Sequence, residues 1–272
     1  MSNERIRLGG MALANGVLVH GPRHWACAVR ADDGQIKTAS GEKPLRIAET
    51  DSRFLRGPLR MAQLFALLPI VRRQLPDARL PFEKPGVAAT LLGSAVAVRV
   101  LRASKVSPVA QELLAGAFAV APAVAALRGS ELAEYHGAEH ISIGTYEHGE
   151  ERQREHERCG SHVLGPLLLT NAAAGVIAGR APAEMRPLAR LAGSVGALAA
   201  SIEIFSWMVQ NERHPLARAL SKPGHELQHR FVTAEPSTEQ LEVANAALAE
   251  CLRLEAESND GRRDTPDETT PT

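Results

Sequence analysis

Residues 135–160, YHGAEHISIGTYEHGEERQREHERCG, hold four of the ten histidines of the chain and one of its three cysteines. Within this stretch His136, Glu139 and His140 form H-x-x-E-H, and His156 and Cys159 form H-x-x-C. Residues four apart on a helix lie on one face, with Cβ atoms roughly 5–6 Å apart. The imidazoles of His136 and His140 can therefore reach one ion, and His156 and Cys159 can share a face in the same way. The spacing predicts a metal site.

Imidazole nitrogen and thiolate sulfur are both ligands that zinc accepts in tetrahedral geometry. H-x-x-E-H is the reversed form of a zinc-hydrolase signature in which the glutamate, here Glu139, serves as general base. If His136, His140, His156 and Cys159 all bind zinc or another divalent metal, the site is closed and structural. If only three bind, a position stays open for water and catalysis becomes possible. Histidines four apart also occur by chance on polar helices, so the motif by itself leaves the role open.

Three patches of the chain resemble a known bacterial family. They are YHGAEH with the later YE and H-x-R-C-G, the N-terminal stretch GMALANGVLVHGPRHWACAVR at residues 10–30, and LQHRFVTAEPSTEQLEVANAAL at residues 227–248. In their order and residue pattern they are similar to the YqhQ-like family of unknown function, whose members are described as predicted metal-dependent enzymes. The resemblance runs from about residue 9 to about residue 252. It implies a helical, usually membrane-associated protein with a metal site and no established reaction.

The chain departs from that pattern at several positions. The family usually has a glutamate where Asn15 stands, an arginine near His20 and a lysine where Ile141 stands. The resemblance therefore indicates a divergent member. His136, His140, His156 and Cys159 all match the family's pattern, which favours a preserved metal site.

Charge and cysteine content limit the classes of partner. Lys and Arg together number 31, as do Asp and Glu, so the formal net charge is zero. Nucleic-acid binding depends on a basic surface, so we expect no nucleic-acid partner. Three widely spaced cysteines do not form a disulfide framework, which favours a reduced, cytosol-facing site. The first ten residues lack an apolar run, and no signal peptide is expected from them.

The expected fold is α+β and mostly α. Residues 1–50 form a β-rich unit of two to four strands, because apolar runs flank the turn signal Asp32-Asp33-Gly34. Residues 51–255 form an Ala-rich helical domain that carries the site, capped near residue 51 or 52 and with Pro69 kinking or ending its first helix. Residues 256–272 lack apolar side chains and are expected to be a disordered tail.

Four apolar segments raise the question of a membrane: residues 87–98, 113–127, 163–179 and 191–209. A full span needs about 20 apolar residues. The first segment is expected to end at Arg99, and the second contains Pro122. The mean hydropathy of −0.13 suits a soluble bundle, whereas the family resemblance favours membrane association. We expect a cell-membrane protein with lipids as partners and the site facing the cytoplasm; the alternative is a cytoplasmic bundle.

Two further features are candidates for a functional role. Glu203 lies in an apolar run and would be a functional candidate in a membrane, but a locally paired acid in a bundle is favoured. His225 and His229 are four apart and could add a ligand, but no cysteine or acidic motif supports them.

The sequence leaves two function classes open. One is a metal-dependent hydrolase with Glu139 activating water. The other is a non-enzymatic, membrane-associated scaffold in which a closed metal site only stabilises the fold.

Overall fold

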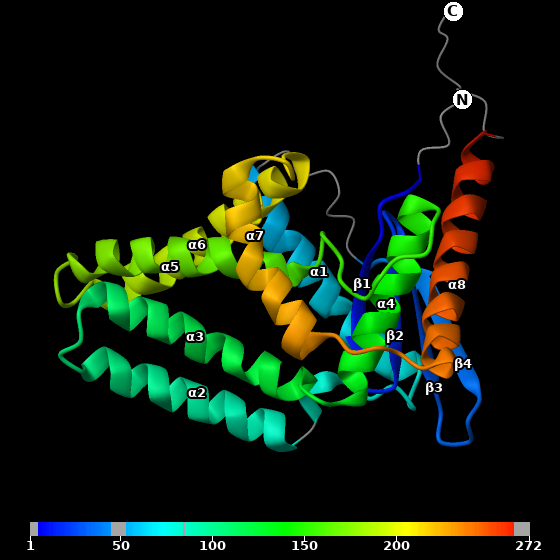
Figure 1. Cartoon of the computed structure of the whole chain (residues 1–272), viewed down its shortest axis with the longest axis horizontal. Helices are drawn as coiled ribbons and strands as arrows, with labels where there is room; N and C mark the ends of the chain where they lie inside the picture. Colours follow the sequence, from blue (N-terminus) through cyan, green and yellow to red (C-terminus); the bar gives the residue numbers. More distant parts are fainter. Residues whose placement is uncertain (1–4, 45–52, 84, 264–272) are drawn as a thin grey trace, which may run out of the picture.

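The computed structural model describes residues 5–44, 53–83 and 85–263. Its β unit is a four-stranded antiparallel meander in the order β1-β2-β3-β4, at one end of the molecule (Figure 1). The strands are β1 (Gly9–Leu13), β2 (Gly16–His20), β3 (His24–Arg30) and β4 (Ile36–Glu42). The predicted α+β class, with a small N-terminal sheet in a mostly helical chain, is confirmed.

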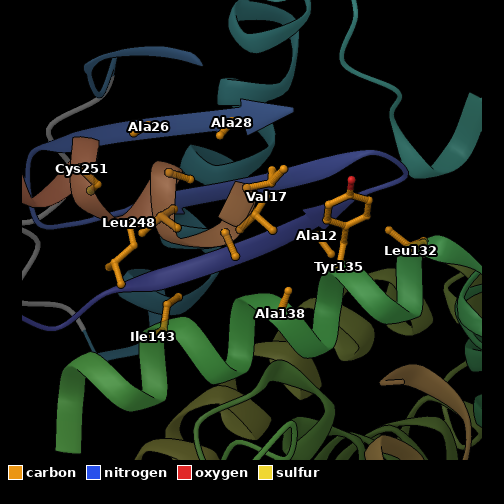
Figure 2. Packing of buried hydrophobic residues seen from close by; sticks show 14 of the residues in the cluster. Ala12, Val17, Ala26, Ala28, Leu132, Tyr135, Ala138, Ile143, Leu248 and Cys251 are labelled. Atoms are coloured by element: carbon orange, nitrogen blue, oxygen red, sulfur yellow. The ribbon is translucent and has the colours of Figure 1, made fainter. Parts of the chain in front are cut away.

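The two faces of the sheet are covered by different helices. Successive side chains of a strand point to opposite faces, so Val17 and Val19 pack with residues of α4 (Glu131–His148) and α8 (Thr238–Arg263). Figure 2 shows Tyr135, Ala138 and Ile143 of α4 directed at this face. Leu18 lies in the second core, which α1 (Arg53–Gln74) completes on the other face.

Trp25 is the anchor of this second core. It is 1% exposed and packs in one cluster with Leu67, Leu68 and Val71 of α1. The helix α1 runs through Pro69 to Gln74, so Pro69 does not end it, and a kink at Pro69 stays a prediction. A proline removes one hydrogen bond from a helix, and here the buried Leu67 and Leu68 before Pro69 and the buried Val71 after it pack the helix against the sheet. The expected cap at residue 51 or 52 lies outside the described residues.

Two helical hairpins extend away from the sheet (Figure 1). The first is α2 (Pro85–Ala103) with α3 (Pro108–Leu127), and the second is α5 (Leu164–Gly179) with α6 (Arg186–Gln210). The hairpins pack against each other through α3 and α5. Their connecting turns, 104–107 and 180–185, both lie at the end of the molecule far from the sheet.

All four of these helices are long and apolar enough to cross a membrane. The expectation that the first segment ends at Arg99 is wrong, because α2 continues to Ala103; arginine is a good helix former and does not interrupt a helix. Pro122 likewise lies inside α3. Glu203 lies half-buried in α6.

The remaining described elements complete the C-terminal half. They are the short helical turns η2 (Pro81–Glu83) and η3 (Gly160–Val163), the helix α7 (Pro215–Leu227) and the π-helical turn η4 (Gln228–Val232). The helix α8 reaches Arg263, eight residues into the segment expected to be disordered. Arg253 pairs with Glu250 and Glu257 there, which supports a solvent-facing helix. Residues 264–272 lie outside the described residues, and the division into domains stays a prediction.

Candidate metal centre

The helix α4 presents its histidines beside the face that packs on the sheet. Glu131 and Glu134 lie in its first turn, where negative charge favours a helix N-terminus. Gly149 ends the helix in the left-handed conformation, with φ of 77°. Between these ends, Tyr135 and Ala138 are buried against the sheet core. His136 and His140 therefore point toward the segment that follows the helix, which contains Cys159.

Three of the predicted ligands converge. Ligand atoms of His136, His140 and Cys159 all lie within 4.8 Å of one another. The Cys159 Sγ is 3.7 Å from the Nε2 of His136, and the two imidazole centroids are 4.4 Å apart. With Zn–N near 2.0–2.1 Å and Zn–S near 2.3 Å, tetrahedral geometry requires an N–S separation of about 3.6 Å. The observed separation fits a shared zinc ion.

Backbone carbonyls orient both imidazoles. The Nδ1 of His136 lies 2.8 Å from the carbonyl oxygen of Val232, and the Nδ1 of His140 lies 2.6 Å from that of Arg154. A carbonyl only accepts, so each Nδ1 must carry the proton. Each Nε2 is then the atom available as a ligand, and such carbonyl partners are the usual supports of metal-binding histidines.

Cys159 lies in surroundings that favour its thiolate. It caps η3, where its Sγ accepts a hydrogen bond of 3.5 Å from the backbone N–H of Ser161. Burial opposes ionisation, but His140 and His136 outweigh it and hold the pKa of Cys159 well below its usual value. In turn, burial would lower the pKa of His140, but the neighbouring Cys159 raises it. Thiolate is the form of cysteine that binds metals.

His156 does not join this group. Its ring centroid is 5.5 Å from that of His140, but both of its nitrogens have other partners. The Nδ1 accepts a hydrogen bond of 3.1 Å from the backbone N–H of Arg158, and the Nε2 lies 3.2 Å from a carboxylate oxygen of Glu147. An Nδ1 that accepts leaves the proton on Nε2, which donates to Glu147. The geometry thus supports three protein ligands where the sequence offered four.

Glu139 lies at the edge of the group. Its Oε2 is 3.9 Å from the Nε2 of His136, and the residue is 7% exposed. It packs against β1 at Gly10, where a Cβ would meet the Glu139 Oε1 at 2.3 Å. The glycine leaves the space that the carboxylate occupies. Glu139 thus lies beside His136, His140 and Cys159 but does not belong to this group, whose ligand atoms all lie within 4.8 Å of one another.

A cavity of about 500 Å³ adjoins the three ligands and Glu139. Its other walls are mostly apolar and come from β1, the end of α3 and the start of α4, including Met11, Ala126 and Leu132. His20 also lines it. Burial and the nearby Lys43 lower the pKa of His20 to about 4, so this imidazole is neutral at physiological pH.

Comparisons with known proteins agree with the motifs. Residues 128–254 match the family model described as "Protein of unknown function (DUF1385)". The chain is 31% identical over 138 residues to the uncharacterized protein YqhQ of Bacillus subtilis (strain 168). Both matches support a YqhQ-like family, to which this chain is similar as a divergent sequence.

The match covers 48% of this chain and 43% of the Bacillus protein, so the chain spans less than half the length of this curated relative. No solved structure matches the chain. The family match at residues 128–254 contains His136, Glu139, His140, His156 and Cys159, whereas Gly10 and the rest of β1 lie before it.

Sequence reasoning missed two residues that build the site. A Cβ on Gly137 would lie 2.1 Å from the carbonyl oxygen of Ala234, so only glycine lets residues 232–234 approach α4 and orient His136. Gln228 is fully buried; its Oε1 accepts from the backbone N–H of His156 and its Nε2 donates to the Ser161 hydroxyl. A glycine inside the H-x-x-E-H motif could have indicated a close approach of another segment at Gly137, whereas nothing in the sequence around Gln228 indicated its role.

His225 and His229 lie apart from the metal centre. Their rings stack with centroids 6.5 Å apart, and the Nδ1 of His229 lies 2.9 Å from a carboxylate oxygen of Glu155. Neither belongs to the group that could hold an ion.

Proposed function

We propose that this protein is a membrane-associated, zinc-dependent hydrolase in which His136, His140 and Cys159 bind the metal. The observation that carries the proposal is the convergence of two imidazole nitrogens, each oriented by a backbone carbonyl, with one thiolate. Structural zinc sites almost always use four protein ligands, whereas catalytic sites use three and keep one position open. Three ligands beside a cavity favour the catalytic type.

Bound zinc would supply Lewis acidity and lower the pKa of water at the open position. Glu139 is buried, close to His136 and directed at the same region, so its carboxylate is placed to accept a proton from that water. The apolar walls of the cavity would exclude bulk water and strengthen these electrostatic interactions. The mostly apolar lining favours a substrate with a sizeable apolar part.

The exposed apolar residues support membrane association. In α2, Leu91, Leu92, Val96 and Val100 are between 50% and 71% exposed. Soluble monomers rarely expose contiguous apolar patches of more than a few hundred Å². Helices of 18–25 residues match a hydrocarbon core of about 30 Å. The two hairpins would cross the bilayer, and the sheet and metal centre would lie together at one membrane surface.

The distribution of basic residues favours a cytoplasmic position for that surface. Cytoplasmic segments near spans carry an excess of Lys and Arg. The two turns at the far ends of the hairpins, with the helix ends beside them, carry six basic residues: Arg99, Arg102, Lys105, Arg180, Arg186 and Arg190. The segments flanking the spans on the sheet side carry Arg72, Arg73, Arg79, Arg128, Arg152, Arg154, Arg158, Arg213, Arg218 and Lys222. A reducing cytoplasm would also keep the Cys159 thiol available.

Metal analysis of the protein purified in detergent tests the proposal. We expect about one zinc per chain in the wild type and in H148A, because His148 is an exposed histidine on the same helix. H140A and C159A should retain little zinc. Zinc contents in H140A and C159A that match the wild type would refute the metal centre.

Glu139→Gln then separates a hydrolase from a scaffold. It should keep the zinc but lose turnover of a p-nitrophenyl ester by about 10²–10⁴-fold, the usual contribution of a general base. If the wild-type protein has no zinc-dependent esterase activity and E139Q only alters stability, the site is structural. A cysteine ligand and the burial of His140 are the observations that favour this second function.

A further inference from the structure

A second cavity lies at the far ends of the helical hairpins, remote from the metal centre. It has a volume of about 480 Å³ and lies between the end of α2 and the start of α6. Three arginines line it: Arg102, Arg186 and Arg190. Arg186, Arg190 and Ser194 follow one another at four-residue spacing, so they share one face of α6. The walls of this arginine pocket thus carry strong positive charge.

Only part of this charge is neutralised among the described residues. Arg102 pairs with the buried Glu112 at 3.3 Å. Arg186 donates from its Nε to the carbonyl oxygen of Ala181 at 3.0 Å, which fixes the side chain without neutralising it. Arg190 has a buried Nε atom with no hydrogen-bond partner in the described structure, as does Arg102. The pocket therefore contains buried hydrogen-bond donors that lack an acceptor among the described residues.

Two further features favour an anion. The pocket includes the first turns of α6, a helix of 25 residues, whose N-terminus carries partial positive charge. Guanidinium groups match the geometry of phosphate oxygens and bind them through paired hydrogen bonds. A phosphate with spare acceptor oxygens would satisfy the buried donors of Arg102 and Arg190 together.

The surroundings of the pocket indicate where this phosphate comes from. Leu188 and Leu191 are 63% and 65% exposed on the same turns of α6. Arg190 lies four residues, about 6 Å, from the start of that helix. If the hairpins cross a bilayer, this is the depth at which an arginine reaches the headgroup layer and leucines contact acyl chains.

We infer that the arginine pocket formed by Arg102, Arg186 and Arg190 binds the phosphate of an anionic lipid headgroup. The choice of a lipid rather than free phosphate as the source rests on the proposed membrane insertion. The leaflet concerned is the one opposite the metal centre, because the pocket and the sheet lie at opposite ends of the hairpins (Figure 1).

Lipid titration followed by native mass spectrometry tests this inference on the full chain in detergent. The probes are phosphatidylglycerol, phosphatidylcholine and inorganic phosphate. The test variant is R190Q, since Arg190 has no ion-pair partner among the described residues that would lose its counter-charge. R102Q, by contrast, would leave Glu112 buried without its arginine. The matched control is R180Q, at an exposed arginine of the 180–185 turn that precedes α6 and does not line the pocket.

We expect the wild type and R180Q to bind phosphatidylglycerol more tightly than phosphatidylcholine, and R190Q to bind phosphatidylglycerol about tenfold more weakly. Equal weakening in R180Q and R190Q would overturn the inference, because it would indicate general surface charge. Displacement of the lipid by equimolar inorganic phosphate would overturn the lipid assignment in favour of a soluble phosphate. Resistance to alkaline carbonate extraction, measured in parallel for all three proteins, tests membrane insertion separately.

Discussion

Replacing Gly10 with alanine tests the packing that positions Glu139. Gly10 lies in β1 with an ordinary negative φ, so alanine introduces no backbone strain. Its Cβ, however, would lie 2.3 Å from the Oε1, 2.6 Å from the Cδ and 2.7 Å from the Cγ of Glu139. All three atoms are well inside van der Waals contact, so either the carboxylate or the strand must shift.

Neither group can shift freely. Glu139 is 7% exposed, and α4 is held against the sheet by Tyr135 and Ala138 on the adjacent face. Overpacking a well-packed site usually destabilises a protein by about 1–3 kcal/mol. For a chain of this size, 1 kcal/mol corresponds to about 2–4 °C in Tm, which predicts a loss of about 2–12 °C for G10A.

Thermal unfolding in detergent measures this loss, with G41A as the matched control. Gly41 is also a strand glycine, but its added Cβ would meet its nearest atom, the Nε1 of Trp25, at 3.5 Å, an ordinary contact. We expect G41A to unfold close to the wild type. G10A should also retain zinc, because the three atoms nearest to the added Cβ all belong to Glu139 and none to a proposed ligand. It should lose turnover if Glu139 is the base. A G10A protein as stable as G41A would refute this packing of Glu139 against β1.

Two other measurements test the site and the fold. In metal-free protein at pH 7, iodoacetamide should modify Cys159 first, because its low pKa keeps it as thiolate, whereas burial raises the pKa of Cys27 and Cys251 to about 12. Peptide mass spectrometry identifies the modified cysteines, and added zinc should slow the reaction at Cys159. Preferential labelling of Cys251 would contradict the assignment. Glu255→Ala should lower the unfolding free energy by about 2–4 kcal/mol, because the carboxylate accepts from the backbone N–H groups of the half-buried Arg23 and the buried His24 at 2.8 and 2.7 Å. The control is Glu257→Ala, which removes only a surface ion pair with Arg253 and should change the unfolding free energy, measured by chemical denaturation, by less than about 1 kcal/mol. Equal effects of the two substitutions would argue against the docking of α8 on the sheet.

Local patterns in the sequence were enough to predict the main elements. Alternation in residues 17–19 and 25–30 and the turn at Asp33-Gly34 predicted the sheet, because side chains of a strand alternate between faces whatever the rest of the chain does. Four-residue spacing placed His136 and His140 together, since that proximity is a property of a single helix. Family motifs identified the relatives of the chain. Apolar length and composition likewise indicated candidate spans, but not their pairing.

Tertiary structure alone decided which of the candidate ligands lie together. The sequence could not show that His156 pairs with Glu147, or that the carbonyls of Val232 and Arg154 orient the imidazoles of His136 and His140, because these partners lie up to 96 residues apart. It also could not show that Gly10 makes room for Glu139 or that Arg102 meets Arg186 and Arg190 at the hairpin ends. Such contacts depend on how helices and strands pack, and packing is set by the shapes of side chains distributed over the whole chain. Periodicity within one segment carries no information about it.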